Sequence, residues 1–161
     1  MPSPRTRRRR DTPPPRTGPA EVDVLRGFLD HLRAAVVAKV EGVPEPLVRT
    51  AVVPSGTSLL GLVRHLAHVE RFTFLGEEVD DWPATFRPRP DETVGSLLAD
   101  YRDAIDRANA VLDACVDLTE PVARRGRPST RWALVHMIEE TGRHAGHADI
   151  LRELIDGSTG R

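Results

Sequence analysis

Apolar residues recur every three or four positions in four separate segments of this chain, and no segment shows the apolar–polar alternation of a half-buried strand. The spacing predicts helices over residues 21–40, 57–76, about 94–112 and about 130–155. Short breaks containing proline and glycine separate them. Amphipathic helices of these lengths bury their apolar faces against one another, so we expect an all-α four-helix bundle.

The first twenty residues differ from the rest of the chain. They hold six of the 14 prolines and six of the 23 basic residues, with almost nothing apolar. This composition predicts a disordered basic tail over residues 1–20, followed by one helical domain over residues 21–161. The tail could contact RNA or anionic lipid, or simply stay solvated. The remainder of the chain is acidic, which argues against a specific nucleic-acid-binding domain.

Other features of the sequence narrow the class of protein. No run reaches the roughly 18 uninterrupted apolar residues of a membrane span, and the first residues lack the apolar core of a signal peptide. We therefore expect a cytoplasmic protein without a membrane partner. Cys115 is the only cysteine, which excludes an intramolecular disulfide and a cysteine-based zinc cluster. We interpret Cys115 as a packing residue, so any metal must be held by His and carboxylate.

The fourth segment carries polar groups within its apolar face. At about 100° per residue, Glu140 and His144 fall in the middle of the apolar stripe. His136 and His147 fall on the same arc, where they could relay protons or hold Glu140 in place. The apolar members of this arc are Ala133, Met137, Ala148, Leu151, Leu154 and Ile155. A bare buried carboxylate is costly, so Glu140 needs a partner. A divalent metal shared with His144 is one solution, and a direct hydrogen bond between buried His and Glu is another.

The second segment offers a third ligand. His65 lies just inside the edge of its apolar arc, whereas His68 lies further out and is expected at the rim. His65, Glu140 and His144 together would leave coordination positions open to water or substrate. That pattern is typical of a catalytic rather than a structural zinc site.

Two stretches resemble the DinB/YfiT-like superfamily of four-helix metalloproteins, and in particular an actinobacterial branch known as a domain of unknown function. They are "VPSGTSLLGLVRHLAHVERF" at 53–72 and "STRWALVHMIEETGRHAGHADILRELIDG" at 129–157. The resemblance covers roughly residues 21–157. It implies a bundle that holds one divalent metal, commonly zinc or nickel, through three side chains.

The resemblance also assigns the ligands. The first is a His in the second helix, matched by His65 in "VRHLAHVE". The last helix of the superfamily usually supplies His-x-x-x-His, and here Glu140 takes the first place and His144 the second. This departure is similar to mycothiol-dependent maleylpyruvate isomerase, a relative with Glu at that place. His147 stands where many relatives have Gln, which implies a residue beside the ligands rather than a ligand.

The superfamily also implies a function. Several relatives transfer mycothiol, bacillithiol or glutathione, so we expect a metal-dependent S-transferase that uses mycothiol as co-substrate with a small-molecule substrate. A hydrolase with a metal-bound hydroxide, and a bundle that binds metal or ligand without catalysis, are the alternatives. Relatives commonly pair, which implies a homodimer, and Phe74 and Trp82 could cover the partner.

Overall fold

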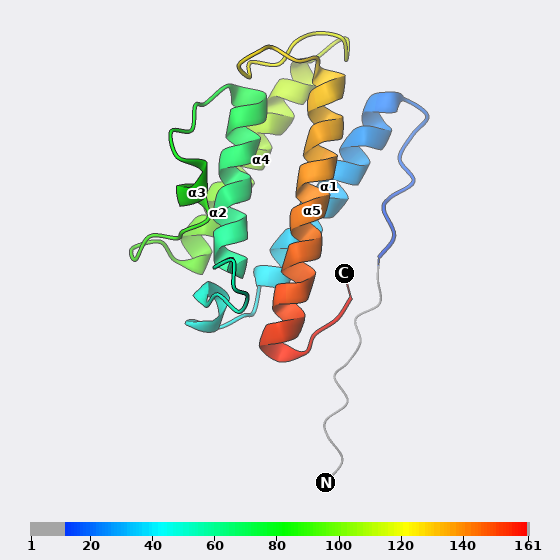
Figure 1. Cartoon of the computed structure of the whole chain (residues 1–161). Helices are drawn as coiled ribbons and strands as arrows, with labels where there is room; N and C mark the ends of the chain where they lie inside the picture. The colour runs from blue at the N-terminus through cyan, green and yellow to red at the C-terminus, as the bar shows by residue number, and fades with distance from the viewer. Residues whose placement is uncertain (1–11, 161) are drawn as a thin grey trace.

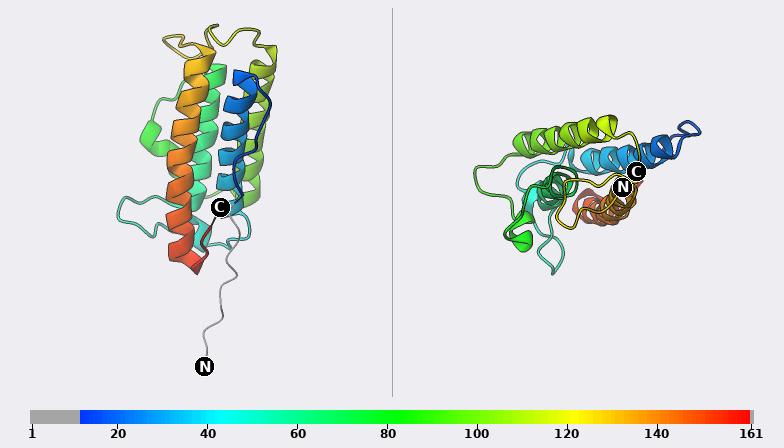
Figure 2. Two further views of the ribbon diagram at one scale, coloured as in Figure 1. Left: turned by 90° about the vertical axis from the view of Figure 1, so that its right-hand side faces the viewer. Right: turned by 90° about the horizontal axis from the view of Figure 1, so that it is seen from above.

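The computed structural model describes residues 12–160. The greater part of the predicted tail, residues 1–11, lies outside the described residues. Residues 12–20 form no helix or strand and run alongside the first helix (Figure 2). The Thr17 hydroxyl donates a hydrogen bond to the backbone carbonyl of Asp23, in the first turn of that helix, at 2.7 Å. The last residues of the expected tail are therefore in contact with the helical domain.

The described chain is helical and has no strand among residues 12–160, which confirms the predicted all-α class (Figure 1). Four long helices lie side by side, with α1 packed against α5 and α2 packed against α4. They match the four predicted segments, and their bounds are Glu21–Val40 for α1, Leu59–Glu70 for α2, Val94–Ala114 for α4 and Thr130–Asp156 for α5. The short elements are η1 (Leu47–Arg49), the π turn η2 (Arg71–Leu75) and α3 (Trp82–Thr85). No helix within residues 12–160 has the length and apolar character needed to cross a bilayer.

Local sequence signals explain where the helices begin and end. Ser58 accepts a hydrogen bond from the backbone N–H of Gly61 at 3.1 Å and caps the start of α2. Ser129 caps α5 in the same way, and Gly157 ends α5 in the left-handed region with φ of 73°. The α-helical part of the second predicted segment is shorter than expected. After Glu70 the winding changes from α to the wider π turn η2, and the helical segment ends at Gly76.

The structure corrects two sequence-based placements. Phe74 is fully buried and cannot cover a partner subunit. The wider winding of η2 turns Phe74 into the core, against Val69 and Met137. Leu154 was expected on the core-facing side of α5 but is 58% exposed. Its neighbour Ile155 packs against the core, so Leu154 is exposed because it lies on the side of α5 that also carries the exposed His147. The homodimer stays a prediction.

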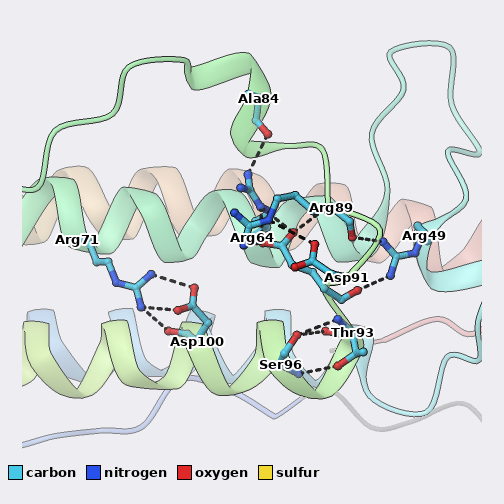
Figure 3. A network of polar contacts seen from close by, with 10 residues as sticks. Arg49, Arg64, Arg71, Ala84, Arg89, Asp91, Thr93, Ser96 and Asp100 are labelled. Carbon is cyan, nitrogen blue, oxygen red and sulfur yellow. Dashed lines mark hydrogen bonds and ion pairs between the residues drawn. The ribbon is translucent and has the colours of Figure 1, made fainter.

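A polar network on the outer side of α2 fixes the segment that follows η2 (Figure 3). Arg64 donates through Nε to both carboxylate oxygens of Glu92, at 3.1 and 3.0 Å. Its Nη1 donates to the carbonyl of Ala84 in α3 at 2.9 Å. Arg71 binds the carboxylate of Asp100 in α4 through two nitrogens, at 2.9 and 2.8 Å. The contacts of Arg64, the chain neighbour of His65, hold α3 beside α2, and those of Arg71 hold η2 against α4.

Candidate metal centre

His65 of α2 meets Glu140 and His144 of α5 between the two helices. Nε2 of His144 lies 3.1 Å from Oε1 of Glu140, and Nε2 of His65 lies 3.5 Å from the same oxygen. The ligand atoms that the three residues offer all lie within 4.8 Å of one another. Bonds from zinc to N and O ligands are about 2.0–2.2 Å long, so modest side-chain movement would bring all three atoms onto one ion. The structure thus brings together the three residues predicted as ligands.

The helices explain how these side chains come together. Glu140 and His144 are four residues apart in α5, which places them one above the other on one face. His65 projects toward them from the buried face of α2. His65 and His144 are only 5% and 7% exposed, whereas Glu140 is half-buried. The cluster is therefore shielded from water without being sealed off.

Residues of α3 and its following loop orient the His65 ring. The Thr85 hydroxyl donates its single hydrogen to the carbonyl of Trp82 at 2.6 Å. It can therefore only accept from Nδ1–H of His65, 2.7 Å away. The Phe86 ring stacks on His65 with centroids 3.8 Å apart. Gly61 makes this possible, because a Cβ there would overlap the carbonyl oxygen of Phe86.

This orientation discriminates between a metal site and a simple His–Glu hydrogen bond. With its proton on Nδ1, His65 directs the Nε2 lone pair at Oε1 of Glu140, which is also an acceptor. Burial and the nearby His144 lower the pKa of His65 to about 4, so its ring is neutral at physiological pH. A hydrogen bond accounts for the His144–Glu140 contact but leaves two acceptors facing each other at His65. A divalent cation accounts for both contacts.

The charge states of the other two groups fit the same donor set. Burial lowers the pKa of His144 despite the attraction of Glu140, which favours the neutral imidazole that binds metals. Burial by itself would raise the pKa of Glu140, but the adjoining His144 and His65 outweigh it and hold the pKa of that carboxyl below its ordinary value. Arg143 adds positive charge on the solvent side, with Nη1 3.8 Å from Oε2 of Glu140. Two neutral imidazoles and one carboxylate are a typical zinc donor set.

His147 and His136 lie around this cluster rather than within it. His147 is exposed, with Nδ1 3.3 Å from Nδ1 of His144. His136 is half-buried, stacks on Trp132 with centroids 4.7 Å apart, and has no hydrogen bond to Glu140 in the described chain. Both were expected to face inward, but their side of α5 borders open space instead of packed side chains. His68 lies apart in a groove with Arg64 and Arg71, as its rim position predicted.

Two cavities meet at the cluster. One, of about 500 Å³, has aromatic and cationic walls, and the other, of about 450 Å³, is mostly apolar. Both are bordered by Phe86, His144 and His147. The larger is also lined by His65, Val69, Phe72, Thr73, Trp82, Arg124, His136, Glu140 and Arg143. The smaller is also lined by Val53, Ser55, Thr57, Leu62, Ile150 and Leu151. The two volumes suit small-molecule ligands.

Several residues that shape the site were missed in the sequence. Thr85, Phe86 and Trp82 lie in a stretch that the sequence indicates only as a proline-rich connection. A signal for α3 was nevertheless present, since Asp81 followed by Trp-Pro is typical of an N-cap with proline in the first turn. Nothing local to that stretch indicates that it folds back over His65.

Replacing Thr85 with valine is expected to lower the affinity for zinc about 10–100-fold, as loss of a partner behind a ligand typically does. The change keeps the shape of the side chain but removes the acceptor for Nδ1–H of His65. Competition with a chromogenic chelator would measure the affinity. Thr57→Val, at the rim of the apolar cavity, is the matched control and should leave zinc affinity unchanged. An unchanged affinity in Thr85→Val would contradict the proposed orienting role.

A family model described as mycothiol-S-transferase matches residues 24–157. The match runs from the first turn of α1 to Gly157, so it contains all but the first three helical residues and includes all three residues of the cluster. No curated protein sequence matches the chain.

Proposed function

We propose that this chain, which belongs to the mycothiol-S-transferase family of the DinB/YfiT-like superfamily, joins the sulfur of mycothiol to an electrophilic small molecule with the help of one divalent metal ion. The family supplies the thiol and the class of reaction. The observation that carries the proposal is that two ligand-sized cavities meet at His144, within the cluster of possible metal ligands. A reaction between two small molecules needs such an arrangement.

His65, Glu140 and His144 are the residues that would hold the metal. When bound, a divalent cation there would supply the positive charge that lowers the pKa of a thiol to near neutrality. The only cysteine of the chain, Cys115, lies at the end of α4, where its thiol donates to the carbonyl of Asp117 at 3.2 Å, and it lines neither cavity. The external thiol is therefore the nucleophile.

The surrounding residues would position the reactants and carry the proton. The thiol proton can pass to His147, whose exposed ring borders both cavities. The thiolate sulfur then forms a bond to the electrophilic carbon, and the leaving group departs with the bonding electron pair. Phe86 covers the cluster on the side of His65, which keeps water away from the reacting sulfur.

The test is a transfer assay with the zinc-loaded protein, mycothiol and 1-chloro-2,4-dinitrobenzene. We expect formation of the thioether with release of chloride, and loss of this activity after the metal is chelated. Glutathione should replace mycothiol poorly. His68 lies outside both cavities, so the variant His68→Ala is the matched control and should retain the wild-type rate.

Two outcomes of this assay would overturn the proposal. Zinc-loaded protein that forms no thioether with mycothiol would exclude the transfer. Formation of dinitrophenol without consumption of thiol would support a hydrolase instead. Zinc rather than nickel, a cytoplasmic location and a homodimer are separate predictions that this assay does not address.

A further inference from the structure

Arg124 lines the larger cavity in an unusual state. Its guanidinium lies over the rings of Phe72 and Trp132, 4.7 and 5.0 Å from their centroids. Nη1 is covered by protein atoms, yet it donates to no acceptor in the described chain. Aromatic faces attract the cation but do not accept the five N–H groups of an arginine as a carboxylate does. A covered donor without an acceptor costs free energy. Nε and Nη2 also donate to no acceptor among residues 12–160 and are not covered in this way, so they are the donors that a ligand could reach.

No other arginine of residues 12–160 that is at least partly buried is left in this state. Each one is bound to an acidic side chain at hydrogen-bonding distance, and these residues are Arg26, Arg33, Arg49, Arg64, Arg71 and Arg152. The arginines without such a partner among the described residues, apart from Arg124, are exposed to water. Within residues 12–160, every partly buried guanidinium group except that of Arg124, beside the candidate metal centre, is therefore paired with an acidic side chain.

The loop that carries Arg124 is built into the fold. It connects α4 to α5, and Val122 donates from its backbone to the carbonyl of Pro128 at 3.0 Å. Gly76, at φ of 70°, lets the loop approach the end of η2, since a Cβ there would lie 2.7 Å from the carbonyl oxygen of Ala123. This close contact sets the residue after Ala123 over Phe72 of η2. The position of Arg124 thus depends on specific backbone contacts.

We propose that Arg124 binds a carboxylate of the electrophilic substrate, so that the protein prefers anionic electrophiles. The inference rests on the proposed function. A carboxylate can accept two parallel hydrogen bonds from one guanidinium, and the contacts with Phe72 and Trp132 would help to hold that group in place. Arg143 lines the same cavity but is already paired with Glu139, so Arg124 is the cation with free donors.

The chemistry of the thiol places the carboxylate on the other reactant. The cysteinyl carboxyl group of mycothiol is joined in an amide, so the thiol has no carboxylate to offer. The aromatic walls formed by Phe72 and Trp82 suit a flat or unsaturated carbon skeleton between the carboxylate and the metal cluster. An aromatic or unsaturated carboxylic acid with an electrophilic carbon is the substrate class that fits these walls.

The first experiment measures binding without thiol or turnover. Trp82 and Trp132 are the only two tryptophans of the chain, and they line the cavity or contact Arg124, so a nitroaromatic ligand there should quench the fluorescence. Zinc-loaded protein would be titrated with 3-nitrobenzoate and with the neutral 3-nitrobenzamide. We expect the acid to bind about 10–100-fold more tightly, as for a hydrogen bond to a charged group.

Variants then assign this preference to one residue. Arg124→Met should lower the affinity for 3-nitrobenzoate to that for the amide, while binding of the amide stays the same. Arg124→Lys, which keeps the charge without the planar fork, should retain part of the preference. The neighbouring Arg125 is exposed and borders neither cavity, so Arg125→Met should behave as wild type. Equal binding of acid and amide, no binding of the acid at millimolar concentration, or a preference that survives in Arg124→Met would overturn the proposal.

A second readout separates this inference from the proposed transferase activity. With mycothiol, 4-chloro-3-nitrobenzoate and 4-chloro-3-nitrobenzamide would be compared as electrophiles. We expect Arg124→Met to raise KM for the acid about 10–100-fold with little change for the amide. Transfer without discrimination would refute the role of Arg124 and leave the function standing. Discrimination in binding without any transfer would refute the function and leave the carboxylate site standing.

Discussion

Replacing His144 with alanine is expected to remove the metal from this protein. Wild-type protein should bind one zinc ion per chain, and His144→Ala should bind it about 100–1,000-fold more weakly. Four-ligand zinc sites contribute about 10–16 kcal/mol, or roughly 3–4 kcal/mol for each ligand, and 1.4 kcal/mol is a factor of ten. Elemental analysis of protein purified without a histidine tag gives the occupancy, and a chelator competition gives the affinity.

Variants at Glu140 separate a ligand from a hydrogen-bond acceptor. Glu140→Gln keeps the shape and can still accept a hydrogen bond from His144, but it loses the charge that favours a metal. We therefore expect it to lose zinc, whereas Glu140→His should keep zinc through a His-x-x-x-His pair. His68→Ala should keep full occupancy, because that ring lies in a different groove.

The metal should also stabilise the fold, since an ion that binds only the folded chain adds RT ln(1 + [L]/Kd) to its stability. Zinc is thus expected to raise the Tm of wild-type protein and to leave that of His144→Ala nearly unchanged. Full zinc occupancy in His144→Ala would refute the ligand assignment. Absence of zinc from the wild type as well would support the plain hydrogen-bonded cluster.

The candidate ligands could be found from the sequence because helical periodicity fixes direction as well as location. Glu140 and His144 stand where α5 should be apolar, and a polar pair on such a face indicates either a site or a buried hydrogen bond. His65 could be distinguished from His68 by the same projection, since three residues along a helix change the direction of a side chain by about 60°.

Residues that act across the fold could not be found in this way. Thr85 orients His65 from 20 positions further along the chain, through an element of only four residues. Arg124 depends on a loop that approaches Gly76 from a distant part of the sequence. The spacing of apolar residues shows which face of a single helix is buried. It does not show which loop packs over that face. It also assumes a closed core, so it placed His147 inward where the structure has a cavity mouth.

Replacing Arg33 with methionine should cause the largest loss of stability predicted for this chain. Arg33 of α1 donates through Nε and Nη2 to the two carboxylate oxygens of Glu70 in α2, at 2.7 and 2.6 Å. Its Nη1 binds Asp30 and Asn109, at 2.7 and 3.0 Å. Although burial opposes it, Glu70 and Asp30 raise the pKa of Arg33, and the guanidinium stays charged.

The variant would strand a charge in the core, because Glu70 is fully buried. Removing one partner of a buried ion pair costs about 3–5 kcal/mol, which corresponds to a fall in Tm of roughly 6–20 °C for a domain of this size. Urea unfolding followed by circular dichroism would measure the change. Arg102→Met, which breaks the exposed pair with Glu41, is the matched control and should cost about 1 kcal/mol or less.

The pH dependence of Arg33→Met identifies the stranded carboxylate as the cause. Burial raises the pKa of Glu70, and without Arg33 little opposes that rise. Between the unfolded pKa of about 4.3 and the raised folded pKa, the folded variant holds a proton that the unfolded chain has released. The stability of the variant should therefore fall as pH rises through this window, and its deficit relative to wild type should shrink toward pH 4.

A second substitution tests the same explanation independently of pH. In Arg33→Met/Glu70→Leu no charge is left in the core at this pair, and apolar side chains of similar volume fill the space. Such replacements are often neutral or stabilising, so the double variant should recover most of the loss. A double variant as unstable as Arg33→Met would mean that lost packing, rather than the stranded charge of Glu70, destabilises the single variant. A stability difference between Arg33→Met and wild type that grows toward acid pH would also argue against the stranded charge of Glu70 as the cause.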